Sequence, residues 1–508
     1  MPITLKNPGG PIVGLDIGSN LIKVCQAQLR AGRPEVTALA VLPTPPEAVT
    51  NNEIVDPVAL GKALRALLGQ AGIKGRHVVT SVAGQNAVVV RIIEVPKMTP
   101  AELRETMKWE VERHIPFPAD QVELDFQPLS APEEVPEGAN MEVLLAVAQE
   151  QVIARHIEAL QAAGLEPKVI DIEPLASQRS LLVLGNGESA PGSVAIIDLG
   201  ATSTDINIFR GGRIAFTRTI QIAGNSLTKA ISDVLGQPLA QAEQLKQDMA
   251  AVPEDAAFAE EAGVDPLAGL GAFDFNAAAG GGAGAGFGAA PAAPATGEPG
   301  VDIAAGGFAP SAFTETTEGP IFETGPMPTV GGPGGTAPGG APAGAVPFDA
   351  GLAGPTPAAS PFASPFDTGP APEALTGAPA APARFPAPTA GGGDEYRRTQ
   401  IADAILPVLG ELVTELRRSL DFFRNRANGD GVHQVLICGG TAKLPGLASF
   451  LQRNLGVPVA VASGLEHVGV TARCEPAYVQ DVGPIFPVSV GLAVREMLIE
   501  APAPRARR

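Results

Sequence analysis

An aspartate ends an apolar segment close to the N-terminus, in the stretch VGLDIGSNLIKV (residues 13–24). Asp16 is followed by Gly18, Ser19 and Asn20, so the alternation of a β-strand breaks at a short polar turn. A carboxylate there is costly unless a cation lies opposite it. Small residues let backbone N–H groups approach phosphate oxygens, which Mg²⁺ commonly accompanies. The segment therefore predicts half of a site for a nucleotide and its magnesium ion.

A second copy of this pattern is found in SVAIIDLGATSTDINIF (residues 193–209). Asp198 ends the apolar strand, and Gly200, Thr202 and Ser203 form the turn. Two such hairpins facing each other across a cleft would hold one hydrated Mg²⁺ between their aspartates. A single Asp-x-Gly turn is a weak signal because such turns are common. Two of them in one chain favour nucleotide binding.

Two further patterns suit the rest of a nucleotide. Gly439 and Gly440, in LICGGTAKLPG, follow an apolar strand and leave room for a flat ring or a sugar. Glu243 and Lys246 are three residues apart on one predicted helix face, within reach of a common ligand. An exposed ion pair of small energetic value is the alternative for these two residues.

The elements that must position these residues alternate between strands and helices in two sets. This order favours an α/β fold of two similar lobes. Predicted helices begin near Asp56 and Thr99, each followed by a proline that suits the first helical position. Glu102 completes a capping box with Thr99. Gly164 is a suitable left-handed stop for a third helix.

The acidic charge of the chain is concentrated in one segment. The chain has 508 residues and a net charge of −19. Residues 251–395 are mostly Ala, Gly and Pro, and they contain one Arg against 16 Asp and Glu. Such a segment buries too little apolar area to offset its ordering entropy, so we expect a disordered insertion. Without a basic stripe elsewhere, nucleic acid is not an expected partner.

Cysteine usage and hydropathy indicate the cellular compartment of the protein. The three cysteines lack metal-like spacing, which predicts reduced thiols in a cytosolic protein. The N-terminus lacks the apolar core of a signal peptide, and no run of about 18 apolar residues predicts a membrane span.

The motif order DxGS…K, DxGxTxTD, AExLK and GGTAxLPG resembles the actin-like ATPase superfamily, and within it the PilM family of type IV pilus assembly proteins. Residues 96–129 are similar to that family's inserted subdomain, and residues 169–182 to its inter-lobe helix. The likeness covers about residues 11–250 and 396–497. It does not cover the long insertion, which departs from the compact family pattern.

The resemblance implies a bilobed actin-like ATPase fold made of duplicated RNase H-like domains. The first lobe would span residues 11–190 and carry an inserted α+β subdomain at about 77–148. The second lobe would consist of residues 191–250 and 396–480, separated by the disordered insertion 251–395. Residues 481–500 would return to the first lobe as a C-terminal helix.

The resemblance also implies ATP and Mg²⁺ as cofactors. The residues expected to bind nucleotide are Asp16, Gly18, Ser19, Asn20, Lys23, Asp198, Gly200, Thr202, Ser203, Gly224, Asn225, Glu243, Lys246, Gly439, Gly440, Thr441 and Lys443. Asp16 and Asp198 would flank the metal, and Asp198 and Glu173 would serve catalysis, with Glu173 orienting the attacking water. Phosphoryl transfer needs mostly positioning and charge neutralisation. Glu173 precedes Pro174 and could instead only cap a helix, which leaves weak ATPase activity open.

The implied function is a cytoplasmic ATP-binding scaffold of type IV pilus assembly, peripheral to the inner membrane through its partners. The resemblance implies that the N-terminal cytoplasmic peptide of PilN lies extended in a groove beside the inserted subdomain, and that nucleotide biases lobe closure and peptide affinity. Other inner-membrane and motor components of the pilus, and a homo-oligomer, are further expected contacts.

Two alternatives remain at this level. An FtsA-like cell-division protein would need a C-terminal amphipathic helix, whereas Pro502 and Pro504 interrupt the tail. A small-molecule kinase of the same superfamily would need a general base beside the outer phosphate, and no second acidic cluster indicates one.

Overall fold

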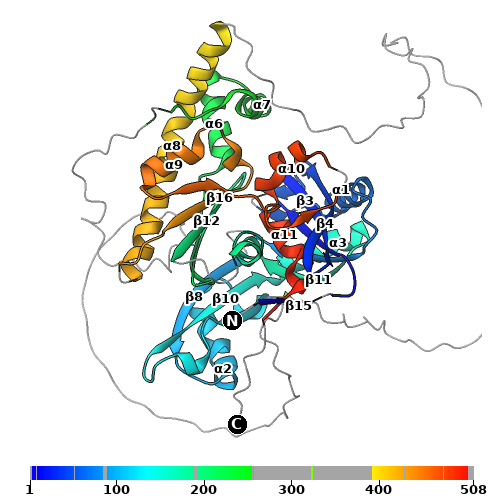
Figure 1. Cartoon of the computed structure of the whole chain (residues 1–508), viewed down its shortest axis with the longest axis vertical. Coiled ribbons are helices and arrows are strands. Elements are labelled where there is room, and N and C mark those ends of the chain that lie inside the picture. The colour runs from blue at the N-terminus through cyan, green and yellow to red at the C-terminus, as the bar shows by residue number, and fades with distance from the viewer. Residues whose placement is uncertain are drawn as a thin grey trace, which may run out of the picture. The chain divides into compact units, whose positions relative to one another are not determined.

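Two sheets with a similar strand order form the cores of the two lobes in this computed structural model (Figure 1). Each contains an antiparallel three-stranded meander whose first strand is joined in parallel by later strands of the chain. The structure describes residues 3–6, 8–50, 52–83, 88–186, 192–254, 256, 322–323, 392–427, 429–472 and 474–500. The repeated order agrees with the predicted fold of two similar α/β lobes.

The first lobe is built on a seven-stranded sheet of order β15-β11-β7-β2-β3-β4-β18. Its strands are β2 (Ile12–Ile17), β3 (Leu21–Arg30), β4 (Arg33–Pro43), β7 (His77–Val82), β11 (Glu166–Ile172), β15 (Phe322–Glu323) and β18 (Gly469–Val470). Alternate residues of β2 point to opposite faces. Val13 and Leu15 pack with α1 (Pro57–Gln70) and α3 (Glu150–Ala163), whereas Ile12 packs with α11 (Pro487–Ala493).

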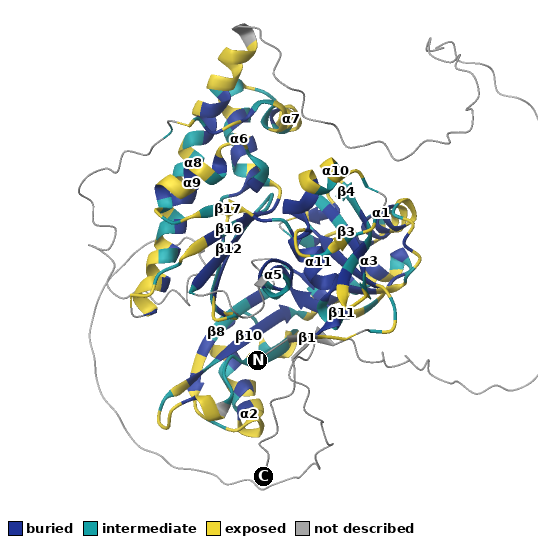
Figure 2. Ribbon diagram, viewed as in Figure 1, coloured by how far each residue is buried: buried dark blue, intermediate teal, exposed yellow. Residues whose placement is uncertain are grey.

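The second lobe is built on a five-stranded sheet of order β14-β13-β12-β16-β17. Its elements are β12 (Ser193–Leu199), β13 (Thr204–Arg210), β14 (Arg213–Ile220), α6 (Gly224–Leu235), α7 (Leu239–Met249), α8 (Gly392–Arg426), β16 (Gln434–Cys438), α9 (Leu447–Leu455) and β17 (Val459–Val461). Ile197 and Ile206 from the sheet share one buried core with Ile405 and Leu416 from α8. Figure 2 shows most of β12 as buried and the outer side of α8 as exposed.

The inserted subdomain is a three-stranded sheet of order β8-β10-β9. Its elements are β8 (Val88–Pro96), α2 (Pro100–Glu110), β9 (Val122–Pro128) and β10 (Asn140–Gln149). Strand β7 fell within the predicted bounds of about 77–148, but it pairs in parallel with β2 and β11. Residues 78–82 of β7 are all buried, which suits a central strand of the first-lobe sheet better than an inserted hairpin.

The predicted helix ends are confirmed. Asp56 Oδ1 accepts hydrogen bonds from two backbone N–H groups at 3.0 and 2.9 Å at the start of α1. Thr99 and Glu102 form the reciprocal capping box of α2. α3 ends at Gly164, whose φ of 80° is left-handed. Local sequence was sufficient here because each cap involves neighbours in the chain.

The edges of the predicted insertion differ from the expected 251–395. Val252 is buried in the second-lobe core, and its N–H donates to Pro445 O at 2.8 Å. Helix α8 begins at Gly392, and residues 322–323 form β15. The remainder of that range, apart from residues 251–254 and 256, lies outside the described residues.

The C-terminal segment is not the single helix expected over 481–500. It comprises the end of α10 (Pro476–Val482), a 3₁₀ turn, α11, a second 3₁₀ turn and β19 (Leu498–Glu500), which pairs with β1 (Ile3–Leu5). Prolines at 484 and 487 lack the backbone N–H that a continuous helix needs, so the helix is interrupted there.

Other short elements are β5 (Val49–Thr50), β6 (Glu53–Ile54), α4 (Glu173–Gln178), a π-helical turn over 179–183 and α5 (Leu184–Asn186).

Among the described residues, no helix combines the length and apolar character that crossing a bilayer requires.

Helix α11 packs against its neighbours by direct backbone contact. A Cβ atom on Gly491 would lie 1.7 Å from Ala176 O in α4, and one on Gly14 in β2 would lie 2.0 Å from Ser489 O. These distances are too short for any side chain, so glycine is required on both sides of the helix.

We expect Gly491→Ala to lower the free energy of unfolding by at least about 3 kcal/mol. Overpacking typically costs about 1–3 kcal/mol, and here the obstacle is backbone rather than a movable side chain. Urea denaturation followed by circular dichroism measures the change. Gly69→Ala in α1 is the control, because its added methyl group meets nothing within 4 Å. Equal stability of the two variants would contradict this packing.

Candidate nucleotide site

The first predicted phosphate loop joins β2 to β3. Gly18 N–H donates to Leu21 O at 3.1 Å and closes the turn. Asp16 is 5% exposed, and its Oδ2 lies 2.9 Å from Lys23 Nζ, directly across the strand pair. Lys23 therefore neutralises part of the aspartate charge inside the loop.

The second predicted loop repeats the first at the level of hydrogen bonds. Gly200 N–H donates to Ser203 O at 3.0 Å, just as Gly18 donates to the residue three positions later. Asp198 precedes this turn in β12, as Asp16 does in β2. The sequence likeness of the two hairpins therefore corresponds to the same local geometry.

The two loops meet through their hydroxyl groups and one asparagine. Ser19 Oγ lies 3.4 Å from Thr202 Oγ1, and both hydroxyls donate to Oδ1 of Asn52. Asn52 Nδ2 donates to Ser203 Oγ at 3.4 Å. Asn52 has φ of 64° in the turn between β5 and β6. Asn52 was not among the predicted site residues, although asparagine in a short turn signals a left-handed residue.

Several carboxyl groups surround one ammonium group between the loops. Burial raises the pKa of Glu173 well above its usual value, and Asp16, Asp205 and Asp198 raise it further. Burial likewise raises the pKa of Asp198 to about 7, with Lys23 opposing the shift. The pKa of Asp205 is also raised by burial, while a hydrogen bond donated by the Thr219 hydroxyl opposes the shift. Burial and mutual repulsion thus disfavour the ionised form of these carboxyl groups, and a bound cation would stabilise it.

Asp205, like Asn52, was not among the predicted site residues. It is the last residue of the motif DxGxTxTD and lies in β13, opposite Asp198 in the strand register. The motif itself contains the signal, because a third acid beside two others at a strand end is unfavourable without a counter-charge.

The glycine pair after β16 packs directly on the second loop. Gly439 has φ of 88°, and a Cβ atom there would lie 2.3 Å from Asp198 Oδ1. Gly440 faces open space, as expected for a residue that leaves room for a ligand. The Thr441 hydroxyl donates to Gly200 O at 2.9 Å. The predicted third segment therefore lies against the second.

The start of α6 completes this contact. Gly224 N–H donates to Gly200 O at 3.1 Å, and Asn225 N–H donates to Ala201 O at 2.8 Å. Lys246 Nζ donates to Gly224 O at 3.1 Å and lies 2.7 Å from Glu243 Oε2. Glu243 and Lys246 thus form the ion pair that was the alternative to ligand contact. The pair lies beside the second loop rather than on an isolated surface. Ribose contact by this pair stays a prediction.

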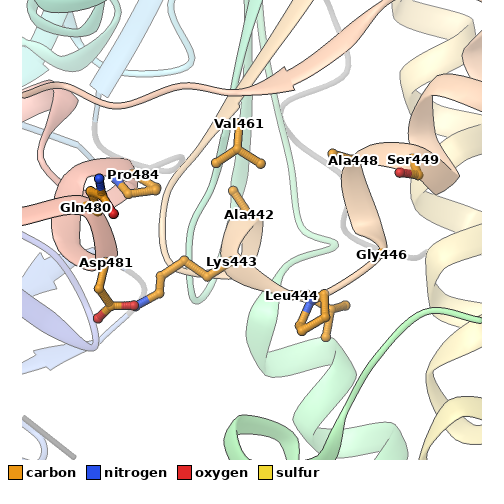
Figure 3. Close-up of a pocket in the computed structure, with 11 residues that line it drawn as sticks. Ala442, Lys443, Leu444, Gly446, Ala448, Ser449, Val461, Gln480, Asp481 and Pro484 are labelled. Carbon is orange, nitrogen blue, oxygen red and sulfur yellow. The ribbon is translucent and has the colours of Figure 1, made fainter. Parts of the chain in front are cut away.

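The side chains of two predicted residues lie away from the facing ends of the two loops. Asn20 has an exposed side chain, and its carbonyl accepts from Thr44 N–H at 2.9 Å. Lys443 Nζ lies 2.7 Å from Asp481 in α10, and both line a pocket of about 350 Å³ (Figure 3). Of the predicted nucleotide residues, this pocket includes only Lys443. We therefore do not take it as the adenosine site.

The carboxylate cluster fits a hydrated divalent cation better than a directly ligated one. Asp16 and Asp198 influence each other's surroundings electrostatically, and Lys23 is the cation that acts on both. Among the described residues, no three His, Cys, Asp or Glu side chains gather closely enough to hold a bare ion. Mg²⁺ usually keeps several waters, so two carboxylates can suffice to hold it.

Comparison with known proteins agrees with this geometry. The family model described as Type IV pilus assembly protein PilM matches residues 14–259, and that of Cell division protein FtsA matches residues 195–483. A solved structure described as the PilM–PilN type IV pilus biogenesis complex aligns with a TM-score of 0.62 and 26% identity. The alignment covers 96% of this chain and 99% of that chain.

Curated relatives come from the division family. Cell division protein FtsA of Pseudomonas aeruginosa is 28% identical over 264 residues, which are 47% of this chain and 60% of the relative. FtsA of Bacillus subtilis is 25% identical over 273 residues, 49% of this chain and 60% of the relative. The chain therefore spans about three fifths of the length of these two relatives.

The duplicated lobes, their paired Asp-x-Gly loops and these matches define an actin-like ATPase fold. The FtsA match over the second lobe fits this superfamily. Within it, the chain is similar to the PilM pilus assembly proteins, because the PilM model matches residues 14–259, from the first lobe into the second, and the PilM structure aligns with nearly the whole chain. The predicted resemblance and fold class are confirmed.

The raised pKa values predict how stability depends on pH without ligand. A carboxyl whose folded pKa exceeds its unfolded value of about 4 stabilises the fold below that value, and the contribution is lost as pH rises through the folded pKa. For Asp198 the window is about pH 4 to 7. We expect the wild type in EDTA to melt at a lower temperature at pH 8 than at pH 5.5.

Asp198→Asn should reduce this pH dependence and raise the melting temperature at pH 8 by about 2–5 °C. Differential scanning fluorimetry across pH 5–8 measures both effects. The matched control is Glu158→Gln, which removes an exposed carboxylate from α3. Parallel melting curves for wild type and Asp198→Asn would contradict the assignment of Asp198 to a buried acidic cluster.

Proposed function

We propose that this chain is an ATP-binding assembly protein of type IV pili, cytoplasmic and held at the inner membrane by its partners. Its similarity to PilM pilus assembly proteins supports the pilus role. The buried carboxylates between two glycine turns are the single observation that carries the nucleotide role. The membrane partner would be a PilN-type protein, because the similar solved structure is a PilM–PilN complex. Its extended peptide would lie between the first-lobe core and the inserted subdomain.

The site residues would have different roles in binding the nucleotide. Asp16 and Asp198 would hold Mg²⁺ through its waters, and the ion would neutralise phosphate charge. Ser19 and Thr202 would present hydroxyl groups to the phosphates from opposite loops. Glu173 would orient a water molecule, since its raised pKa makes it a better proton acceptor than an ordinary carboxylate.

The inserted subdomain gives nucleotide state a route to the peptide groove. Arg426 of α8 in the second lobe lies 2.6 Å from Glu94 of β8, and Arg213 of β14 lies 3.2 Å from Glu134. These exposed ion pairs contribute little energy. The second lobe and the subdomain also share one buried apolar cluster, in which Leu144 of β10 is grouped with Phe209 and Ile214. A shift of the second lobe would therefore be transmitted to the subdomain. A nucleotide that favours one arrangement would change the affinity for a peptide in the groove.

Glu173→Gln separates binding from hydrolysis. We expect it to bind Mg²⁺-ATP within about threefold of wild type in calorimetry, because the amide keeps the shape of the side chain. Single-turnover hydrolysis should fall by at least about 100-fold, as for loss of a general base. Glu158→Gln serves again as the surface control. Unchanged hydrolysis would mean that Glu173 only begins α4.

Coupling predicts that ATP changes peptide affinity. A labelled peptide from the cytosolic N-terminus of a PilN-type protein should bind with a Kd that differs at least about fivefold between the ATP-loaded and nucleotide-free forms, measured by fluorescence polarisation. Asp16→Asn should abolish the difference, since it removes half of the proposed metal site. Identical affinities with and without ATP in the wild type would refute the coupling.

An FtsA-like division role is the second candidate, favoured by the FtsA match over residues 195–483. This role predicts autonomous binding to membranes. Co-sedimentation of the full chain with liposomes that contain anionic lipid would support it, whereas recovery only when a PilN-type protein is embedded would support the pilus role.

A further inference from the structure

A short strand from the Ala/Gly/Pro-rich insertion covers the outer edge of the first-lobe sheet. β15 pairs antiparallel with β11, with Phe322 opposite Ile170 and Glu323 opposite Val169. The same strand contacts β9 of the inserted subdomain. Figure 1 shows β15 beside β11, far along the chain from its neighbours in the sheet. β15 thus lies where the first-lobe core meets the inserted subdomain.

The local sequence explains why this part of the insertion forms a strand. It reads GPIFETGP, in which four residues without Ala, Gly or Pro include a β-branched pair and an aromatic. Such residues favour strands, while the flanking Gly-Pro pairs stop the pairing from extending. Without β15, β11 would be the edge strand of the first-lobe sheet. Its outward backbone N–H and C=O groups would then be available to another chain.

The edge strand β11 is held in place by buried ion pairs. Asp171 of β11 is fully buried and accepts from Arg179 at 2.7 Å and from Arg495 at 3.0 Å. Asp125 of β9 is close enough for its charge to interact with Asp171 and Arg495. Strand β11 therefore keeps its extended shape next to β9, and a peptide that pairs with it orders little besides itself.

We propose that β15 acts as an internal substitute for a partner strand, and that an extended peptide must displace it to pair with β11. This mode of binding is addition of a strand to a sheet edge, in which main-chain hydrogen bonds supply affinity. The inference rests on the proposed function, because it places the PilN-type peptide in the same groove between core and subdomain. The insertion then lowers the apparent affinity for that partner.

The energetics allow such a substitute to be reversible. Among the described residues, two residues of β15 pair with β11, and so short a pairing gives a small intrinsic affinity for the edge. The Ala/Gly/Pro-rich composition of the insertion predicts a flexible tether. Such a tether would give β15 an effective concentration on the order of millimolar, which would offset that weakness. An outside peptide then binds with an affinity reduced by the fraction of molecules in which the edge is free.

The double variant Phe322→Pro, Glu323→Pro tests the inference in the full chain. Proline cannot donate a ladder hydrogen bond, so β15 should no longer pair. The control is Phe308→Pro, Ala309→Pro, which makes the same change elsewhere in the insertion. Hydrogen exchange across residues 166–172 should be faster in the double variant than in the wild type or the control. Equal exchange in all three proteins would overturn the inference.

Two fluorescent peptides distinguish this inference from the proposed function. The first copies residues 316–328 of this chain, and the second is the N-terminal tail of a PilN-type protein. Both should bind the double variant at least about fivefold more tightly than the wild type and the control. A gain for the first peptide alone still supports a covered edge and counts against the PilN-type partner. No gain for the first peptide overturns the inference.

Two near-repeats of the strand sequence require one more variant. FDAG (residues 348–351) and FDTG (residues 366–369) resemble FETG (residues 322–325), and both lie outside the described residues. Placing paired prolines at all three Phe-acid positions removes any replacement of one copy by another. If the inference holds, peptide affinity in this variant equals or exceeds that of the double variant, and wild-type affinity would refute it.

Discussion

Four carboxyl groups from both lobes lie close together, and a single ammonium group acts on three of them. Asp16 comes from one lobe, Asp198 and Asp205 from the other, and Glu173 from the helix between them. The charge of Lys23 acts on Asp16, Asp198 and Glu173. Burial strengthens their mutual repulsion because little water screens it. The loops therefore stay together against an electrostatic cost, and other contacts must supply the offset.

Those contacts depend on small residues and on backbone. Gly439 allows the third segment to reach Asp198, and Gly200 O accepts hydrogen bonds from two other segments. Gly14 and Gly491 let α11 touch both β2 and α4 without side chains between them. The acidic centre thus lies on rigid elements whose positions are set by close packing. Precise placement matters more here than any one side chain.

The sequence alone predicted what is encoded locally. Thr99 with Glu102 specifies a helix start, and each Asp-x-Gly turn specifies a hairpin, because the interacting groups are a few residues apart. Asn52 and β15 escaped prediction since Thr202 is 150 residues away from Asn52, and β11 is at least as far from β15 in the chain. The predicted bounds of the inserted subdomain, about 77–148, included β7 for the same reason: an apolar run reveals a buried strand but not its neighbours.

The hydroxyl groups of Ser19 and Thr202 are 3.4 Å apart, and Asn52 bonds to both. A phosphate group does not fit between atoms at that separation. A triphosphate would therefore have to act as a wedge, entering only when thermal motion parts the two turns and breaks the asparagine bridge. Nucleotide association would then be slower than diffusion and limited by the frequency of that separation, a microsecond-to-millisecond motion in most two-lobed proteins.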